Sequence, residues 1–395
     1  MRLYDLPRRV TENCIAGRRA HLRFSARAAD CSLPMMGDAF QGRNMNLCTR
    51  MTGACAVTLL MAACADSEPV GDLVPAQWVE LKAGLEQALP ADATGYVFGL
   101  IDCDRIAVRT AGGDLRIDSI VPIASATKAP SAAAILTLVD AGQLDLDRPV
   151  ADYLGDVVDW PALKQPITMR MLLNHTSGLA PEPGCLDENV TTTLVECVQQ
   201  IADAPLRFAP GRQFQYGGGS YQVAGLVAER ISGKTWERFF ASALGEPLGL
   251  RDYHFLGDAN PRIAGGAVSS LDDYLRILQM FMSDGVHGGR RLLSEEMVAL
   301  IRSDQIAGLP KRGTPLDRDL YPGYAFGWWF SDPALHPGSP GPEFSDPGAL
   351  GTVPWIDLGR DYGAVVLLVD GPQAGLDLWN TLRPLILRGL DEAPA

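Results

Sequence analysis

The stretch Ile123-Ala-Ser-Ala-Thr-Lys128 is the part of the sequence around which the rest is organised. A short apolar run precedes it, and residues 132–139 after it have a helical pattern that stops near Gly142. We therefore expect Ser125 at a helix N-terminus. Residues three apart on a helix share one face, so Ser125 and Lys128 are expected to point into the same space.

This pairing has a chemical use. A serine hydroxyl is a poor nucleophile until a neighbour takes its proton, and a lysine can do so if desolvation keeps its amine neutral. The chain has five lysines, and only Lys128 has a serine three residues before it. A capping serine beside a solvated lysine is a commoner explanation of the spacing, so the context has to decide.

The composition places limits on the protein's class. The 395 residues are 47% hydrophobic and include 41 Gly and 28 Pro, which is ordinary for one large globular domain or two. The formal net charge is −13, and no Lys/Arg run occurs outside the N-terminus. Because phosphate contacts need basic patches, this balance argues against a nucleic-acid partner.

The N-terminal residues have a different character. Residues 1–44 are Arg-rich and without periodicity, and we interpret them as a spurious or disordered extension ahead of a natural start at Met45. Residues 45–64 have a basic start and an apolar run too short to span a bilayer. They resemble a bacterial lipoprotein signal in which Cys64 is lipidated; a plain cleaved signal or a buried apolar segment is the alternative. Residues 65–75 would then be a tether, and the protein an exported lipoprotein anchored to the periplasmic face of a membrane.

The later cysteines fit an exported protein, which meets an oxidising compartment. Cys185 and Cys197 are close enough in sequence for a loop-closing disulfide, and Cys103 is expected in a buried strand. The cysteine and acid spacings suggest no metal site, and no cofactor is predicted.

Strand-like segments lie near both ends of the chain. Residues 95–102 and 105–109 are expected to form a hairpin, and residues 323–330 and 363–370 are expected to be strands. Helices are expected between and around them, at residues 76–89, 168–173, 191–203, 221–230, 236–244, 270–284, 294–301 and 376–390. This order predicts one sheet built from distant parts of the chain, a mostly helical lobe inserted between them, and a ligand cleft between the lobes.

Ordered landmarks supply the context that the Ser-x-x-Lys spacing lacks. They include Ile123 to Lys128, Met171-Leu-Leu-Asn-His-Thr-Ser-Gly-Leu179, Phe208-Ala-Pro-Gly211, Glu246-Pro-Leu-Gly-Leu250 and Gly265-Gly-Ala-Val-Ser-Ser270. Together they resemble the serine β-lactamase and penicillin-binding-protein family, in its branch of class C-like β-lactamases, family VIII carboxylesterases and D-amino-acid peptidases. The resemblance implies an α+β fold of β-lactamase/transpeptidase type over residues 76–395, with an antiparallel sheet flanked by helices and an inserted, mostly helical lobe.

The resemblance also implies roles for individual residues. Ser125 matches the acylated nucleophile and Lys128 its proton acceptor. Tyr216 matches a tyrosine that transfers protons, and a phenol acting as a base needs nearby positive charge, for which Lys128 is the obvious source. The amides of Ser125 and Ala349 would form the oxyanion hole.

Two departures from the family pattern affect the expected substrate. The family's Tyr-x-Asn motif has Gly218 in the Asn position, and its third motif aligns with Asp346-Pro347-Gly348, where an acid replaces a cation. Gly218, Asp346 and Gly348 are the predicted substrate-binding positions. An Asp there would repel an anionic substrate, which favours neutral or cationic esters and amides.

We therefore predict an exported serine hydrolase that cleaves a small carboxylic ester or amide through acyl-Ser125. A β-lactamase or D-amino-acid peptidase of the same fold is one alternative, and a catalytically degenerate binding protein is another. His175 is interpreted as structural, while Tyr324, Trp328 and Trp329 fit either the pocket or the core. The oligomeric state stays open.

Overall fold

The computed structural model describes residues 71–187, 191–257, 259–314, 321–331, 333–334 and 336–392. The predicted extension, the signal with Cys64 and most of the tether lie outside these residues. Within them, no helix has both the length and the apolar character needed to cross a bilayer.

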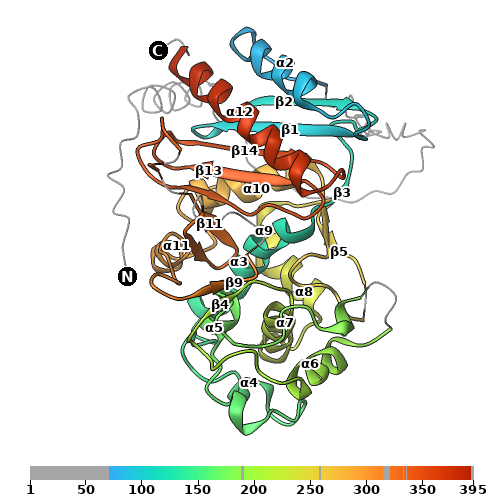
Figure 1. Ribbon diagram of the computed structural model, residues 1–395, viewed down its shortest axis with the longest axis vertical. Helices are drawn as coiled ribbons and strands as arrows, with labels where there is room; N and C mark the ends of the chain where they lie inside the picture. Colours follow the sequence, from blue (N-terminus) through green and yellow to red (C-terminus); the bar gives the residue numbers. More distant parts are fainter. Residues whose placement is uncertain are drawn as a thin grey trace, which may run out of the picture. The chain divides into compact units, whose positions relative to one another are not determined.

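The centre of the fold is a seven-stranded antiparallel sheet with the strand order β10-β11-β12-β13-β14-β1-β2 (Figure 1). Its strands are β1 (Gly95–Asp102), β2 (Arg105–Gly113), β10 (Gly323–Ala325), β11 (Trp328–Phe330), β12 (Glu343–Ser345), β13 (Val353–Asp357) and β14 (Tyr362–Leu367). The N-terminal hairpin joins the C-terminal strands where β1 pairs with β14, with Phe98 opposite Val366. The prediction of one sheet built from distant parts of the chain is confirmed.

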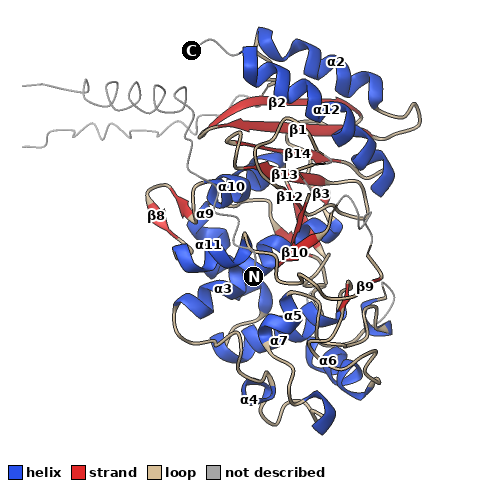
Figure 2. Cartoon of the chain, turned by 60° about the vertical axis from the view of Figure 1, so that its left-hand side comes forward, coloured by secondary structure: helices blue, strands red, loops and turns tan. Residues whose placement is uncertain are grey.

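Helices cover both faces of this sheet, because β1 is apolar on both sides. Tyr96, Phe98 and Leu100 pack in one core with α2 (Val79–Ala88) and α12 (Pro372–Glu392). Val97 and Ile101, which alternate with them, pack in the other core with α10 (Leu271–Met282). Figure 2 shows α2 and α12 on one side of the sheet and α10 on the other.

The remaining helices form the lobe that the sequence places between the two halves of the sheet. They are α3 (Lys128–Asp140), α4 (Ala151–Leu154), α5 (Met169–Leu173), α6 (Leu194–Asp203), α7 (Gly219–Ser232), α8 (Trp236–Phe240), α9 (Glu246–Leu248) and α11 (Glu295–Ile301). Short strand groups accompany them: β3 (Val121–Pro122), β6 (Ala267–Ser269) and β5 (His254–Phe255); β4 (Phe214–Gln215) with β9 (Lys311–Arg312); and β7 (Val286–His287) with β8 (Arg290–Arg291). α3 is almost wholly buried, as its run of small and branched apolar residues requires.

One predicted strand is in fact a hairpin. Residues 323–330 reverse at Phe326 and Gly327, which have φ angles of 45° and 101°. A Cβ at Gly327 would lie 2.4 Å from the backbone of Ala129, so this turn packs directly against the start of α3. Only a glycine allows so close an approach of two backbones.

The three cysteines that follow the predicted signal lie in different surroundings. Cys185 and Cys197 form the disulfide expected from their spacing, with Cα atoms 5.2 Å apart. The prediction that Cys103 lies in a buried strand was wrong. Cys103 is in the turn between β1 and β2, half-buried and with a φ of 60°.

Candidate active site

Ser125 lies in a strand–turn–helix connection. β3 ends at Pro122, a 3₁₀ turn spans Ala124–Thr127, and α3 follows at once. Ala124 has a φ of 45°, which is uncommon for a residue other than glycine and is found at strained functional turns. The hydroxyl of Thr127 donates to the Ala124 carbonyl at 2.6 Å and holds the turn in this conformation.

The amine of Lys128 is directed at Ser125 and withdrawn from solvent. Lys128 is 3% exposed, and its Nζ lies 3.0 Å from Ser125 Oγ and 2.9 Å from the Ala264 carbonyl oxygen. Burial lowers the pKa of Lys128 to about 8; the negative charges of Asp346 and Glu182 oppose this effect, and the charge of Arg262 adds to it. With this pKa, roughly a tenth of the amine is neutral at pH 7, far more than for a solvated lysine, and the neutral amine can accept the Ser125 proton.

Tyr216 borders the same pair. Lys128 Nζ lies 4.4 Å from the centre of its ring, and its hydroxyl oxygen is shielded from solvent without a hydrogen-bond partner among the described residues. Burial and the Asp346 charge raise the pKa of Tyr216 well above the usual value, while the nearby Ser125 hydroxyl lowers it. The phenol is therefore neutral in the resting site, and its predicted role in proton transfer beside Lys128 stays a prediction. A neutral phenol in this position is suited to pass a proton from one group to another.

Other aromatic side chains pack against Tyr216. Its ring centre lies 4.8 Å from that of His175 and 5.4 Å from that of Trp329. The Nε2 atom of buried His175 is 3.0 Å from the Tyr324 hydroxyl. Trp328 packs elsewhere, edge-on to Phe281. These contacts agree with a structural His175 and give Tyr324 and Trp329 the same supporting function.

The turn after β12 runs alongside Ser125. A Cβ at Gly348 would lie 2.2 Å from the Ile123 carbonyl oxygen, so only glycine fits there. The two internal bonds of the turn use the N–H groups of Gly348 and Gly351, and not that of Ala349, whose side chain is exposed. This placement suits an oxyanion donor, and that role of Ala349 stays a prediction.

The carboxylate of Asp346 points into the protein. The residue is fully buried, and its Oδ2 accepts a hydrogen bond from the Ala129 N–H at 3.0 Å, in the first turn of α3. Its Oδ1 has no partner within the described part of the chain. Burial raises the pKa of Asp346, and the charge of Lys128 opposes this. Asp346 thus acts on the site through Lys128 and α3, and its predicted contact with substrate stays a prediction.

Gly218 lies beside a loop whose importance the sequence did not reveal. A Cβ at Gly217 would be 2.4 Å from Pro181, and one at Gly219 would be 2.2 Å from the Ala180 carbonyl oxygen. The Gly217-Gly218-Gly219 run therefore lets this loop lie flat against the start of α7. The three consecutive glycines can be seen in the sequence, but the sequence does not show which residues pack against them.

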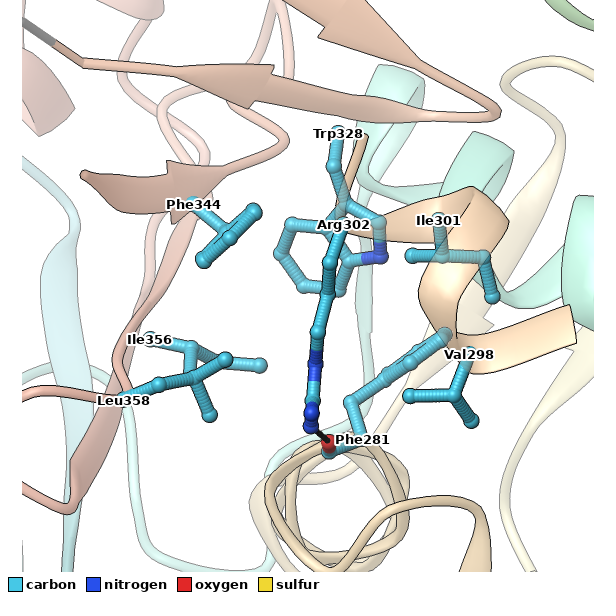
Figure 3. Close-up of a pocket in the computed structure, with 8 residues that line it drawn as sticks. All are labelled: Phe281, Val298, Ile301, Arg302, Trp328, Phe344, Ile356 and Leu358. Atoms are coloured by element: carbon cyan, nitrogen blue, oxygen red, sulfur yellow. Dashed lines mark hydrogen bonds between the residues drawn. The ribbon is translucent and has the colours of Figure 1, made fainter. Parts of the chain in front are cut away.

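The cavity drawn in Figure 3 is a separate feature. It lies between α10, α11 and strands of the sheet, and its lining is almost entirely apolar, including Phe281, Trp328 and Ile356. Arg302 runs across it and donates to the Phe281 carbonyl at 2.7 Å. It contains none of the three predicted catalytic residues, so it does not mark the active site.

The chain is similar to known proteins over most of its length. Residues 83–382 match the family model described as Beta-lactamase. The chain belongs to this family. Its homologues are serine hydrolases such as esterases and peptidases, and this protein is an enzyme of that kind.

Individual relatives span more than one activity. Esterase EstB of Burkholderia gladioli is 34% identical over 176 residues, covering 40% of this chain and 44% of the relative. The D-alanyl-D-alanine-carboxypeptidase/endopeptidase AmpH of Escherichia coli K12 is 24% identical over 314 residues, covering 71% and 80%. The crystal structure of a penicillin-binding protein homologue from Caulobacter crescentus shares the fold, with a TM-score of 0.67, 18% identity and coverage of 79% and 98%.

Proposed function

We propose that this serine hydrolase cleaves a carboxylic ester or amide through an acyl intermediate on Ser125. The observation that carries the proposal is the contact of 3.0 Å between Ser125 Oγ and a lysine amine that is 3% exposed. A buried amine with a pKa of about 8 can take a proton that a solvated lysine could not.

The reaction has two halves. In the first, Ser125 Oγ attacks the substrate carbonyl while Lys128 accepts its proton, and the amides of Ser125 and Ala349 stabilise the oxyanion. The proton passes, with Tyr216 as relay, to the leaving alcohol or amine as its bond to the carbonyl carbon breaks. In the second, water gives a proton to the same groups and attacks the acyl carbon; the acid is released and Ser125 regains its proton.

The charge around Ser125 favours neutral or cationic esters and amides over anionic β-lactams. The third motif supplies buried Asp346 where the resemblance leads one to expect a cation. An anionic substrate would then lack a partner and meet a negative potential. The similarity to an esterase supports the same choice.

The test uses the full chain beside Ser125→Ala. We expect the wild type to hydrolyse p-nitrophenyl butyrate, to react with a fluorophosphonate probe, and to turn over nitrocefin poorly; the variant should do none of these. Equal labelling of both proteins, or no labelling at all, would reject Ser125 as the nucleophile. Labelling without turnover of any ester would favour a binding protein, and efficient nitrocefin hydrolysis would favour a β-lactamase.

We also propose that the protein is exported and anchored through lipidated Cys64. The signal-like sequence of residues 45–64 supports this, and the Cys185–Cys197 disulfide fits an oxidising compartment. Cells expressing the wild type and Cys64→Ser would be fed a labelled fatty acid. Incorporation into the wild type alone, with membrane fractionation, is the expected result; incorporation into neither would reject the anchor.

A further inference from the structure

We propose that Glu182 selects the substrate by binding an ammonium group beside the scissile carbonyl. The inference rests on the proposed function and narrows its substrate class to esters and amides of amino acids or similar amines. Glu182 lies 34 residues before Tyr216, in a loop without a recognisable sequence motif.

The carboxylate of Glu182 lies beside the empty position at Gly218. A Cβ at Gly218 would be 4.0 Å from Glu182 Oε2 and 3.9 Å from the Cβ of Ala264. The carbonyl of Ala264 accepts from Lys128 Nζ, which in turn contacts Ser125. Glu182 therefore reaches the catalytic group from the side of α7, at the position where the side chain of residue 218 is missing.

The chain on either side of Glu182 is held in place. The Gly219 N–H donates to the Pro181 carbonyl at 3.0 Å on one side, and the disulfide of Cys185 with Cys197 fixes the other. The Asn260 amide donates to the Cys185 carbonyl at 2.9 Å. An acid on a supported loop can bind a substrate group without first having to be ordered.

The carboxylate is also available for a ligand. Glu182 is exposed, and it forms no ion pair or hydrogen bond within the part of the chain that the structure describes. Its charge reaches the catalytic residues, since it raises the pKa of both Lys128 and Tyr216. Arg262 is the cation that acts on Lys128 with the opposite sign, and it too is exposed.

The chemistry of the surroundings points to an ammonium group. Among the described charges that act on Lys128, Glu182 and the buried Asp346 are carboxylates, and the exposed Arg262 is the cation that opposes them. A hydrogen bond between an ammonium and a carboxylate is among the stronger polar contacts in proteins. A cationic group held by Glu182 would lie near the carbonyl that Ser125 attacks.

The experiment compares two substrates of nearly equal shape. Alanine methyl ester, which is largely protonated at pH 7, and methyl isobutyrate differ by an ammonium in place of a methyl group. Hydrolysis of each, with both enantiomers of the alanine ester, is followed by acid release for the wild type, Glu182→Gln and Ser125→Ala. We expect the wild type to favour one alanine ester over methyl isobutyrate by at least about 10-fold in kcat/KM, and Glu182→Gln to lose most of that preference.

Two matched variants serve as controls. Asp187→Asn removes another exposed acid of the same loop and should leave the ratio of the two substrates unchanged. Arg262→Gln removes the opposing cation and should raise the ratio. Unchanged thermal midpoints would show that all three variants are folded.

The outcomes separate the two proposals. Absence of Ser125-dependent hydrolysis with every ester would overturn the proposed function, and this inference with it. Ester hydrolysis with the same substrate ratio in the wild type and Glu182→Gln would overturn the inference alone. An equal loss of ratio in Asp187→Asn would also reject it, because general surface charge would then explain the preference.

Discussion

Two buried lysines of this protein occupy opposite ends of helices. Lys128 and Lys164 are each 3% exposed. Lys164 belongs to a separate 3₁₀ turn, and its Nζ reaches the C-terminus of α6, where it donates to the carbonyls of Ile201, Ala202 and Ala204. Lys128 opens α3, where its Nζ contacts one carbonyl and the Ser125 hydroxyl.

The difference shows which surroundings would suit a buried lysine to the proposed role of proton acceptor. The C-terminus of a helix carries partial negative charge and free carbonyls, both of which favour an ammonium. The N-terminus carries partial positive charge, and the amine there has fewer acceptors. Burial lowers the pKa of both lysines. Of the two, Lys128 has the proposed nucleophile Ser125 beside it, and Lys164 has three carbonyl acceptors.

The largest expected effect is on activity. Lys128→Met should lower kcat/KM for p-nitrophenyl butyrate by about a thousandfold or more, because the Ser125 proton would lose its acceptor. Lys164→Met should keep activity within a few-fold of the wild type once the folded fraction is considered. Steady-state kinetics checks both, and a similar loss in the two variants would remove the distinction.

The reverse order is expected for stability. Lys164→Met would leave three carbonyls without their charged donor, and we expect the free energy of unfolding to fall by about 2–4 kcal/mol. Lys128→Met removes an amine from an unfavourable place and should cost little or nothing in stability. Urea denaturation followed by circular dichroism measures both. A large loss of stability in Lys128→Met would show that its amine is mainly structural.

The pH dependence of kcat/KM tests the electrostatic part of the comparison between the two lysines. In the proposed mechanism Lys128 must be neutral to accept the proton, so kcat/KM should rise with pH and level off above about 8. The charge of Asp346 raises the pKa of Lys128, so Asp346→Asn should move this rising limb to lower pH. Asn can still accept from the Ala129 N–H through its amide oxygen. An unmoved limb would mean that Asp346 is protonated in the resting enzyme.

The smallest effect is expected from substitution of Asp203, the acid near Lys164. The Asp203 charge raises the pKa of Lys164, but Asp203 is in an exposed interaction with Gln199 at 2.9 Å. Asp203→Asn should change the free energy of unfolding by less than about 1 kcal/mol, since exposed charges are screened by water. It should leave the pH–rate profile where it was. If Asp203→Asn shifted the pH–rate profile as much as Asp346→Asn, the argument that buried charges act more strongly than exposed ones would be wrong.

Much of the fold could be predicted from local sequence patterns. The hairpin of β1 and β2, the α3 helix after Ser125 and the late strand β14 follow from alternation and helical periodicity in single segments. The reversal at Gly327 was missed because an unbroken aromatic run conceals a two-residue turn. The glycine there is explained only by the backbone of Ala129, nearly 200 residues earlier.

By itself, the sequence determined the family, the order of the elements and the proximity of Ser125 to Lys128. The last follows from local geometry, because the two residues are three positions apart at the start of one helix. The tertiary structure alone decided that Lys128 is buried against Ala264, that Tyr216 meets it face-on, and that Asp346 turns inward. It also brought Glu182 beside Gly218. Burial and charge act through space between residues far apart in the chain, so no local pattern can record them.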